Sequence, residues 1–143
     1  MTKYPSLQVN TDGGSRGNPG PSAIGIVISS NQEVVYSHSE YIGNTTNNVA
    51  EYTAVIKALN LLLEKELFAE SCHFVLDSEL IVKQINGQYK VKQEHLQKLN
   101  TEIKKIINIC LQQKVFNKIV FSHVLRDKNK EADKLVNLAL DSQ

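Results

Sequence analysis

Alternating hydrophobic and polar residues in the first third of the chain predict β-strands. Residues 7–12 alternate strictly, and residues 23–30 and 33–42 are rich in apolar side chains on either side of a two-residue turn. A glycine-rich stretch, residues 13–21, separates the first strand from the second. We therefore expect an antiparallel meander of three strands.

The pattern then changes to helices interrupted by single strands. Hydrophobic residues recur at intervals of three and four from residue 47 or 48 to residue 63, which predicts an amphipathic helix. Further helices are expected at residues 79–85, 95–113 and 131–140, and further strands at residues 73–76 and 115–123. This order predicts an α/β fold with a mixed sheet covered by helices on both faces.

The size and composition of the chain are those of one ordinary domain. A chain of 143 residues can bury one hydrophobic core, so we expect a single domain over residues 1–143. The first ten residues are polar, and no apolar run approaches the roughly 18 residues that span a bilayer. Cys72 and Cys110 are too far apart in sequence for a C-x-x-C motif. We expect a cytoplasmic monomer with reduced thiols and no membrane partner.

Charge is unevenly distributed along the chain, although the formal net charge is only +1. Residues 1–80 carry four Lys or Arg and nine Asp or Glu, whereas residues 81–143 carry twelve and six. An acidic site beside a lysine-rich region suits an enzyme that binds phosphates. Lysines that merely solvate helix faces are the alternative, and composition does not decide between the two.

Four carboxylates stand in four separate predicted elements and suggest a metal site. Asp12 ends the first strand, Glu51 lies near the start of the first helix, Asp77 follows a buried strand, and Asp133 lies near the start of the last helix. Sites made only of oxygen ligands hold hard divalent cations, and two such ions about 4 Å apart can act on both oxygens exchanged at a phosphodiester. We interpret the chain as a nuclease.

Each carboxylate also has an ordinary structural explanation. Asp12 precedes two glycines, as turn-forming Asp residues do, and Asp77 is placed to cap the next helix. Glu51 suits the positive end of a helix dipole, with Asn48 as N-cap and Glu51 three residues later. Asp133 lies among charged residues of the kind that face solvent. Taken one at a time, these positions leave both interpretations open.

Four blocks of sequence together resemble the type 1 ribonuclease H family. They are TDGGSRGNPGPSAIGIVI, TTNNVAEYTAVIKAL, VLDSELIVKQI and HVLRDKNKEADKLVNLAL, which occur in the family's order and cover most of the chain. The resemblance implies a ribonuclease H-like fold with five strands in the order 3-2-1-4-5. It also implies an endonuclease that cleaves the RNA strand of RNA/DNA hybrids and leaves 3′-hydroxyl and 5′-phosphate ends.

The resemblance assigns roles to the four carboxylates. Asp12 would be shared by two cations, Glu51 and Asp77 would be further ligands, and Asp133 would bind the second cation. The implied cofactor is Mg²⁺, which Mn²⁺ can replace, with two ions in the site when substrate is bound. His123 precedes Asp133 by ten positions, as the family's mobile histidine does. If functional, His123 would orient water or help the product leave, and a strand-end histidine bonded to backbone is the alternative.

The implied partner is an RNA/DNA hybrid, contacted from several segments. By resemblance the contacts come from Gly13, Gly14, Ser15, Asn18, Thr46, Asn47, Asn48 and Ser78. Two features depart from many relatives: residues 125–129 lack a glycine-rich sequence, and there is no tryptophan-bearing basic protrusion after Asp77. Lys90 and Lys92 could replace that protrusion in part, through contacts with phosphates, and an exposed loop with no role in binding is the alternative.

Two other functions fit the same fold. A noncatalytic module that only binds nucleic acid or protein would usually lack one carboxylate, whereas all four are present. A nuclease for DNA duplexes or junctions would keep the carboxylates and use other substrate contacts. The Thr45-Thr46-Asn47-Asn48 block favours the hybrid.

Overall fold

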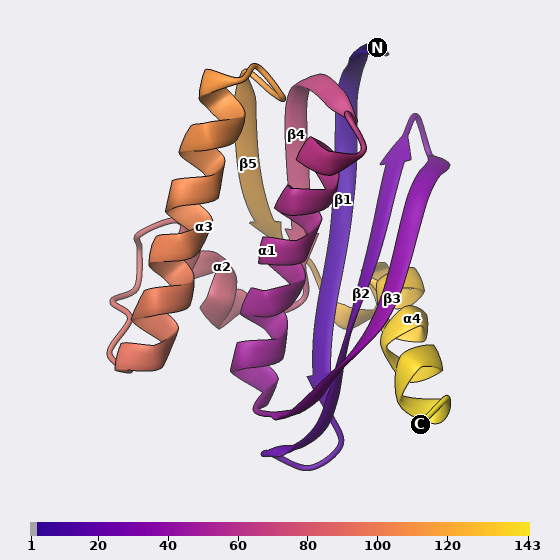
Figure 1. Cartoon of the computed structure of the whole chain (residues 1–143), viewed down its shortest axis with the longest axis vertical. Helices are drawn as coiled ribbons and strands as arrows, with labels where there is room; N and C mark the ends of the chain where they lie inside the picture. Colours follow the sequence, from indigo (N-terminus) through magenta and orange to yellow (C-terminus); the bar gives the residue numbers. More distant parts are fainter. Residues whose placement is uncertain (1–2) are drawn as a thin grey trace.

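The computed structural model describes residues 3–143 and contains one five-stranded sheet in the order β3-β2-β1-β4-β5 (Figure 1). β1 pairs with β2 and β2 with β3 in antiparallel fashion, whereas β1–β4 and β4–β5 are parallel. The strand order implied by the resemblance is therefore confirmed. The elements are β1 (Lys3–Ser15), β2 (Gly20–Ser30), β3 (Glu33–Thr45), α1 (Asn47–Glu64), β4 (Phe68–Leu76), α2 (Glu79–Ile85), α3 (Glu94–Gln112), β5 (Lys118–His123), a short 3₁₀ helix (Arg126–Lys128) and α4 (Lys130–Asp141).

The first strand is longer than its sequence pattern suggested. The glycine-rich stretch was expected to leave the sheet after Asp12, but Gly13, Gly14 and Ser15 continue the ladder and pair with Ile24, Ala23 and Ser22 of β2. Glycine is compatible with a strand where another backbone approaches closely, so composition alone misplaced the end of β1. The loop between β1 and β2 is correspondingly short.

The two parallel strands at the other side of the sheet also have different limits. β4 begins at Phe68, before the expected residue 73. Its first half was missed because polar residues alternate there with buried ones and no continuous apolar run marks the strand. β5 begins at Lys118, after the expected residue 115. Val115 and Phe116 are fully buried, but they lie in the turn that precedes the strand. Burial on its own therefore did not identify a strand.

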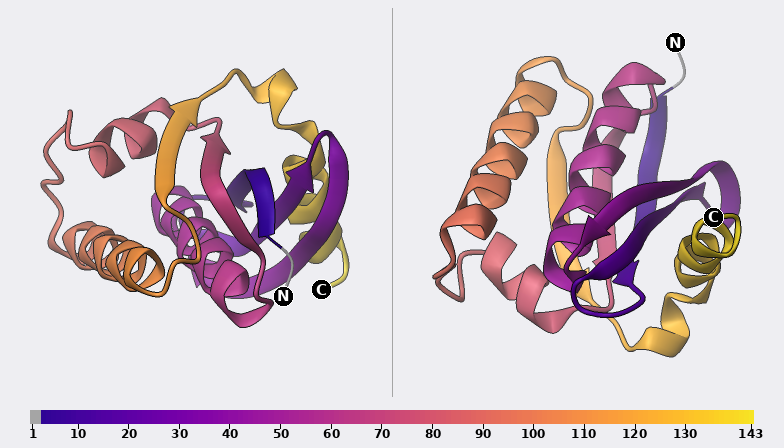
Figure 2. Two further views of the ribbon diagram at one scale, coloured as in Figure 1. Left: turned by 90° about the horizontal axis from the view of Figure 1, so that it is seen from above. Right: turned by 60° about the horizontal axis from the view of Figure 1, so that its bottom comes forward.

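Helices cover both faces of the sheet, as expected. α1 packs on β1 and against α3, while α4 packs on β2 and β3 from the opposite side (Figure 2). The main hydrophobic core lies under α1 and α3, and a much smaller apolar cluster, made of Ala23, Val136, Ala139 and Leu140, lies under α4. Among residues 3–143, no helix combines the length and apolar character needed to cross a bilayer.

The start of α1 differs from the arrangement expected from the sequence. Thr46 is the N-cap, and its hydroxyl accepts a hydrogen bond from the Val49 amide at 3.3 Å. Asn48 is therefore already the second residue of the helix, and Glu51 lies beyond the first turn. The predicted capping by Asn48 with Glu51 is wrong, because Thr46 offers a better-placed acceptor just before the helix. Glu51 is thus not explained by the end of the helix.

Candidate active site

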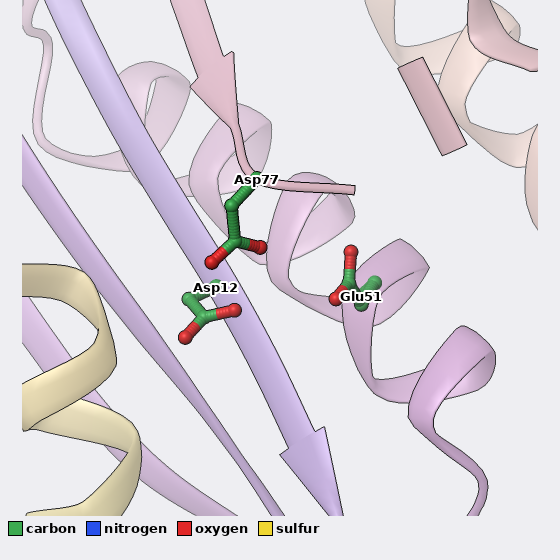
Figure 3. Close-up of side chains that lie close together, drawn as sticks. All are labelled: Asp12, Glu51 and Asp77. Atoms are coloured by element: carbon green, nitrogen blue, oxygen red, sulfur yellow. The ribbon is translucent and has the colours of Figure 1, made fainter. Parts of the chain in front are cut away.

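Three carboxylates from distant parts of the chain meet at one edge of the molecule. Asp12 lies on β1, Asp77 directly follows β4, and Glu51 projects from α1 (Figure 3). One oxygen of each carboxylate lies within 4.8 Å of those of the other two. The parallel register, which pairs Asn10 with Val75, brings Asp12 and Asp77 level with each other two residues later. Strand pairing and helix packing together build this three-carboxylate cluster.

A glycine allows α1 to come close enough to deliver Glu51. A Cβ atom at Gly13 would lie 2.5 Å from the Glu51 nitrogen and even nearer to the backbone of Ala50. Real Cβ atoms essentially never come within 3.0 Å of such atoms, so any larger residue would push α1 off the sheet. Gly13 is therefore part of the structure that brings Glu51 towards Asp12.

Asp133 approaches Asp12 from α4, on the other side of the sheet. It lines one cavity of about 340 Å³ together with Asp12, Glu51 and Gly14. Asp133 is one of the groups whose negative charge raises the pKa of Asp12, although it lies outside the three-carboxylate cluster. Asp12 thus has acidic side chains on two sides. Glu51 and Asp77 lie on one side and Asp133 lies on the other.

Burial and mutual repulsion make these carboxyl groups hard to ionise. Burial, followed by the charges of Asp77, Glu51 and Asp133, raises the pKa of Asp12 from 3.8 to about 9. The pKa of Glu51 rises from 4.5 to about 8, mainly through burial and then through Asp77. Burial also raises the pKa of Asp77. Such a cluster needs nearby positive charge before all of its members can be negative.

The donors fit a divalent metal ion. All of the converging groups are carboxylates, which are the ligands that hard cations such as Mg²⁺, Mn²⁺ and Ca²⁺ prefer. The repulsion that raises the pKa of Asp12 is the kind of interaction that a bound cation relieves. Geometry and electrostatics therefore point to the same occupant.

Comparisons with known proteins agree with this site. A family model described as "Reverse transcriptase-like" matches residues 10–139. A ribonuclease H from Erythrobacter litoralis is 32% identical over 145 residues, covering 96% of this chain and 97% of the relative. The chain belongs to the ribonuclease H family. The solved structure of LC11-RNase H1 in complex with an RNA/DNA hybrid is similar to this ribonuclease H chain, with a TM-score of 0.84 and 42% identity over 95% of this chain and 97% of that one.

Other relatives in the ribonuclease H family are longer proteins. The bifunctional protein Rv2228c of Mycobacterium tuberculosis is 36% identical over 136 residues, which are 94% of this chain. The chain spans only 35% of that relative's length. Membership of the ribonuclease H family implies use of a divalent metal ion, and the acidic cluster provides a place for one.

Arg126 is a residue of the ribonuclease H site that no sequence pattern indicated. It begins the 3₁₀ helix before α4 and lines the cavity that holds Asp12, Glu51 and Asp133. Its positive charge lowers the pKa of Asp77 and of Glu51, against the effect of burial. The run of charged residues before the last helix was visible in the sequence, but no spacing rule indicated which of them would face the carboxylates.

His123 lies on the Asp77 side of the site. It ends β5, and its Nδ1 atom is 3.8 Å from a carboxylate oxygen of Glu79, the first residue of α2. Its charge is among the smaller influences that lower the pKa of Asp77. The histidine is therefore close to the acidic cluster but directed towards a glutamate outside it.

The expected substrate contacts fall into two groups. In the first group, the Ser15 amide donates to the Asn47 side chain at 2.8 Å, and the Asn47 amide donates to the Asn18 side chain at 3.1 Å. These bonds join the β1–β2 loop to the first turn of α1, which Thr46 caps. Gly14 lines the cavity beside them. This group therefore forms one surface next to Glu51.

The second group surrounds a separate cavity of about 510 Å³. Asn48, Tyr89, Lys90 and Lys92 line it, so it begins at α1 and extends to the loop before α3. Ser78 caps α2, where its hydroxyl accepts from the Ile81 amide at 3.3 Å, and it lowers the pKa of Glu51 against the effect of burial. The two lysines are exposed and lie beside an open hollow.

Proposed function

We propose that this chain hydrolyses the RNA strand of RNA/DNA hybrids as an endonuclease and leaves 3′-hydroxyl and 5′-phosphate ends. The observation that carries the proposal is the convergence of Asp12, Glu51 and Asp77, with Asp133 of α4 lining the same cavity as Asp12. It is supported by 42% identity to LC11-RNase H1, a protein whose structure was solved with an RNA/DNA hybrid. We also propose that residues 1–143 act as one domain and as a monomer.

The four carboxylates would hold two Mg²⁺ ions, or Mn²⁺ ions in their place. Asp12, Glu51 and Asp77 would hold one ion, and Asp12 and Asp133 the other, which gives Asp12 the shared position. When bound, such a pair supplies an activated water and neutralises charge on the leaving oxygen. The protons that burial keeps on Asp12 and Glu51 have to leave before either carboxylate becomes a ligand.

Two basic residues beside the cluster complement these carboxylates. Arg126 faces the cavity and offers a guanidinium to a phosphate oxygen, while it helps Glu51 and Asp77 to ionise. His123, placed near Asp77, would orient water or assist product release. Both residues come from the short stretch between the end of β5 and the start of α4.

The hybrid would lie across the two surfaces described above. The wide minor groove of an RNA-containing duplex exposes 2′-hydroxyl groups, which the amide side chains of Asn18 and Asn47 and the neighbouring backbone can read. Asn48 also lines the lysine-bearing cavity, where Lys90 and Lys92 would hold phosphates of the other strand. The substrate would thus be held on both sides of Glu51.

A cleavage assay on three matched duplexes tests this function. In the presence of Mg²⁺, the RNA strand of an RNA/DNA hybrid should be cut to products with 5′-phosphates, and RNA/RNA and DNA/DNA duplexes of the same sequence should not be cut. The Asp12→Asn variant serves as the control for a contaminating nuclease. Cleavage of the DNA duplex would favour a DNA nuclease, and binding without any cleavage would favour a noncatalytic module.

A further inference from the structure

A row of three residues crosses the sheet beneath α4. Asp12 of β1 pairs with Gly25 of β2, and Gly25 pairs with Ser39 of β3. α4 packs on the face that these strands present away from the main core (Figures 1 and 2). The residue next to Asp12 in the sheet is therefore also a residue against which α4 rests.

The backbone of α4 occupies the space that a side chain at position 25 would need. A Cβ atom at Gly25 would lie 2.9 Å from the Leu135 Cβ, 3.1 Å from the Val136 nitrogen and nearer still to the Ala132 carbonyl oxygen. Two of these atoms belong to the helix backbone, which cannot turn aside as a flexible side chain can. A methyl group here would force α4 to retreat by roughly 0.5 Å or more, the tolerance of a working catalytic arrangement.

Two hydrogen bonds hold the same part of α4 on either side of this contact. Before the helix, the buried Asn129 side chain donates to the Thr11 carbonyl at 2.9 Å, directly beside Asp12. Within the helix, the Leu135 carbonyl accepts from the Ser39 hydroxyl at 2.5 Å. Asp133 lies between these two points, so its distance from Asp12 depends on how closely α4 sits on the sheet.

We propose that Gly25 is a positioning residue that sets the separation between Asp12 and Asp133, and with it the binding of the second cation. The inference rests on the proposed two-cation nuclease. Glu51 and Asp77 reach Asp12 from α1 and β4, so a retreat of α4 leaves their geometry unchanged. The effect of a larger residue at position 25 should therefore fall on the part of the site that contains Asp133.

The test compares Gly25→Ala with the wild-type chain by titrating Mg²⁺. We expect the Mg²⁺ concentration for half-maximal cleavage to rise by about 10–100-fold, as for other residues that position metal ligands, with little change in KM for the hybrid. With an uncleavable analogue of the hybrid bound, the stabilisation of the complex by Mg²⁺, measured as the rise in Tm, should require correspondingly more metal. This second readout does not depend on activity.

Ile28→Ala is the matched control for a simple loss of stability. Ile28 lies on the same strand as Gly25, but it is buried in the main core under α1, away from α4. This variant should lower Tm without changing the Mg²⁺ dependence. An unchanged Mg²⁺ dependence in Gly25→Ala, or an equal change in Ile28→Ala, would overturn the inference.

Ser39→Ala decides the question if Gly25→Ala does not fold. It removes the hydrogen bond from the Ser39 hydroxyl to the Leu135 carbonyl of α4 without adding volume. We therefore expect a smaller change in the Mg²⁺ dependence, in the same direction. A wild-type Mg²⁺ dependence would again reject the inference. Failure of the proposed function is distinguishable, because in that case the wild-type chain itself would not cleave the hybrid.

Discussion

The two helices that bring carboxylates to Asp12 are attached to the sheet in different ways. α1 is embedded in the main core, and its buried residues make up much of that core. α4 rests on a small apolar cluster and is held by hydrogen bonds from Asn129 and Ser39. The backbone of each helix packs closely against a glycine of the sheet, which is Gly13 for α1 and Gly25 for α4. Packing therefore fixes Glu51, whereas a few local contacts fix Asp133.

This difference suggests that the two halves of the site are held with different rigidity. Glu51 and Asp77 belong to a rigid half that cannot shift without disturbing the core. Asp133 belongs to a half whose position can change at a smaller cost in folding free energy. The following variants and conditions test that contrast, from the largest expected effect to the smallest.

Asp12→Asn removes the group common to both halves and should have the largest effect. We expect a loss of cleavage of about 10³-fold or more, while binding of the hybrid largely survives because the change in volume is small. Single-turnover cleavage and a gel-shift titration measure the two quantities. Full activity in this variant would exclude Asp12 as the shared ligand.

Replacement of the two glycines should separate folding from metal binding. Gly13→Ala places a methyl group against the backbone of Ala50 and Glu51 under α1, and we expect it to lower the free energy of unfolding by about 1–3 kcal/mol. Gly25→Ala should lower it less, since α4 can retreat, but should change the Mg²⁺ dependence more. Urea denaturation without metal measures the loss in the free energy of unfolding for each variant. Equal losses in the two variants would remove the contrast between the helices.

The metal-free protein should lose stability as the pH rises. The pKa values of Asp12 and Glu51 are raised in the folded state, to about 9 and about 8, so folding holds protons that the unfolded chain releases near pH 4. This stabilisation is fully present below about pH 4 and is lost progressively up to about pH 9. Tm measured in EDTA across that range should fall for the wild type and fall less for Asp12→Asn. A Tm that rises over the same range would contradict the repulsion described here.

The lysines of the second cavity should have the smallest effect. Lys90→Ala with Lys92→Ala is expected to weaken hybrid binding and to reduce the slope of log K against log salt by about 1 for each phosphate that the protein no longer neutralises, with kcat nearly unchanged. Lys118→Ala, which replaces an exposed lysine on β5, serves as the control for removal of a positive charge elsewhere. An unchanged salt slope would exclude this cavity from the substrate path.

The parts of the fold and site that follow local patterns were predictable from the sequence. The periodic pattern predicted α1 and α3, and the four carboxylates stood out by their places in the predicted elements, whereas the strand order and the roles of the carboxylates came from the resemblance. The end of β1 was misplaced because Gly13 and Gly14 suggest a turn, whereas their place in the sheet depends on the helix packed above them. Composition does not contain that tertiary contact.

The contacts made through space were not predictable from one sequence. Gly25 lies in an ordinary apolar strand, and only the register with Asp12 and the approach of α4 give it a role. Arg126 is one of several charged residues in its segment, and only its orientation towards the cavity distinguishes it. The capping of α1 by Thr46 was missed because Thr46 and Asn48 are both suitable N-caps.

The central claim is that Asp12, Glu51 and Asp77, from three separate segments, form one divalent-cation site, and an NMR titration tests it most directly. Mg²⁺ added to ¹⁵N-labelled protein without substrate should shift the backbone amides of Asp12, Gly13, Glu51 and Ser78 together, with a single apparent affinity, and these shifts should be absent in Asp12→Asn. Shifts scattered over unrelated surfaces, or the same shifts in Asp12→Asn, would contradict the account.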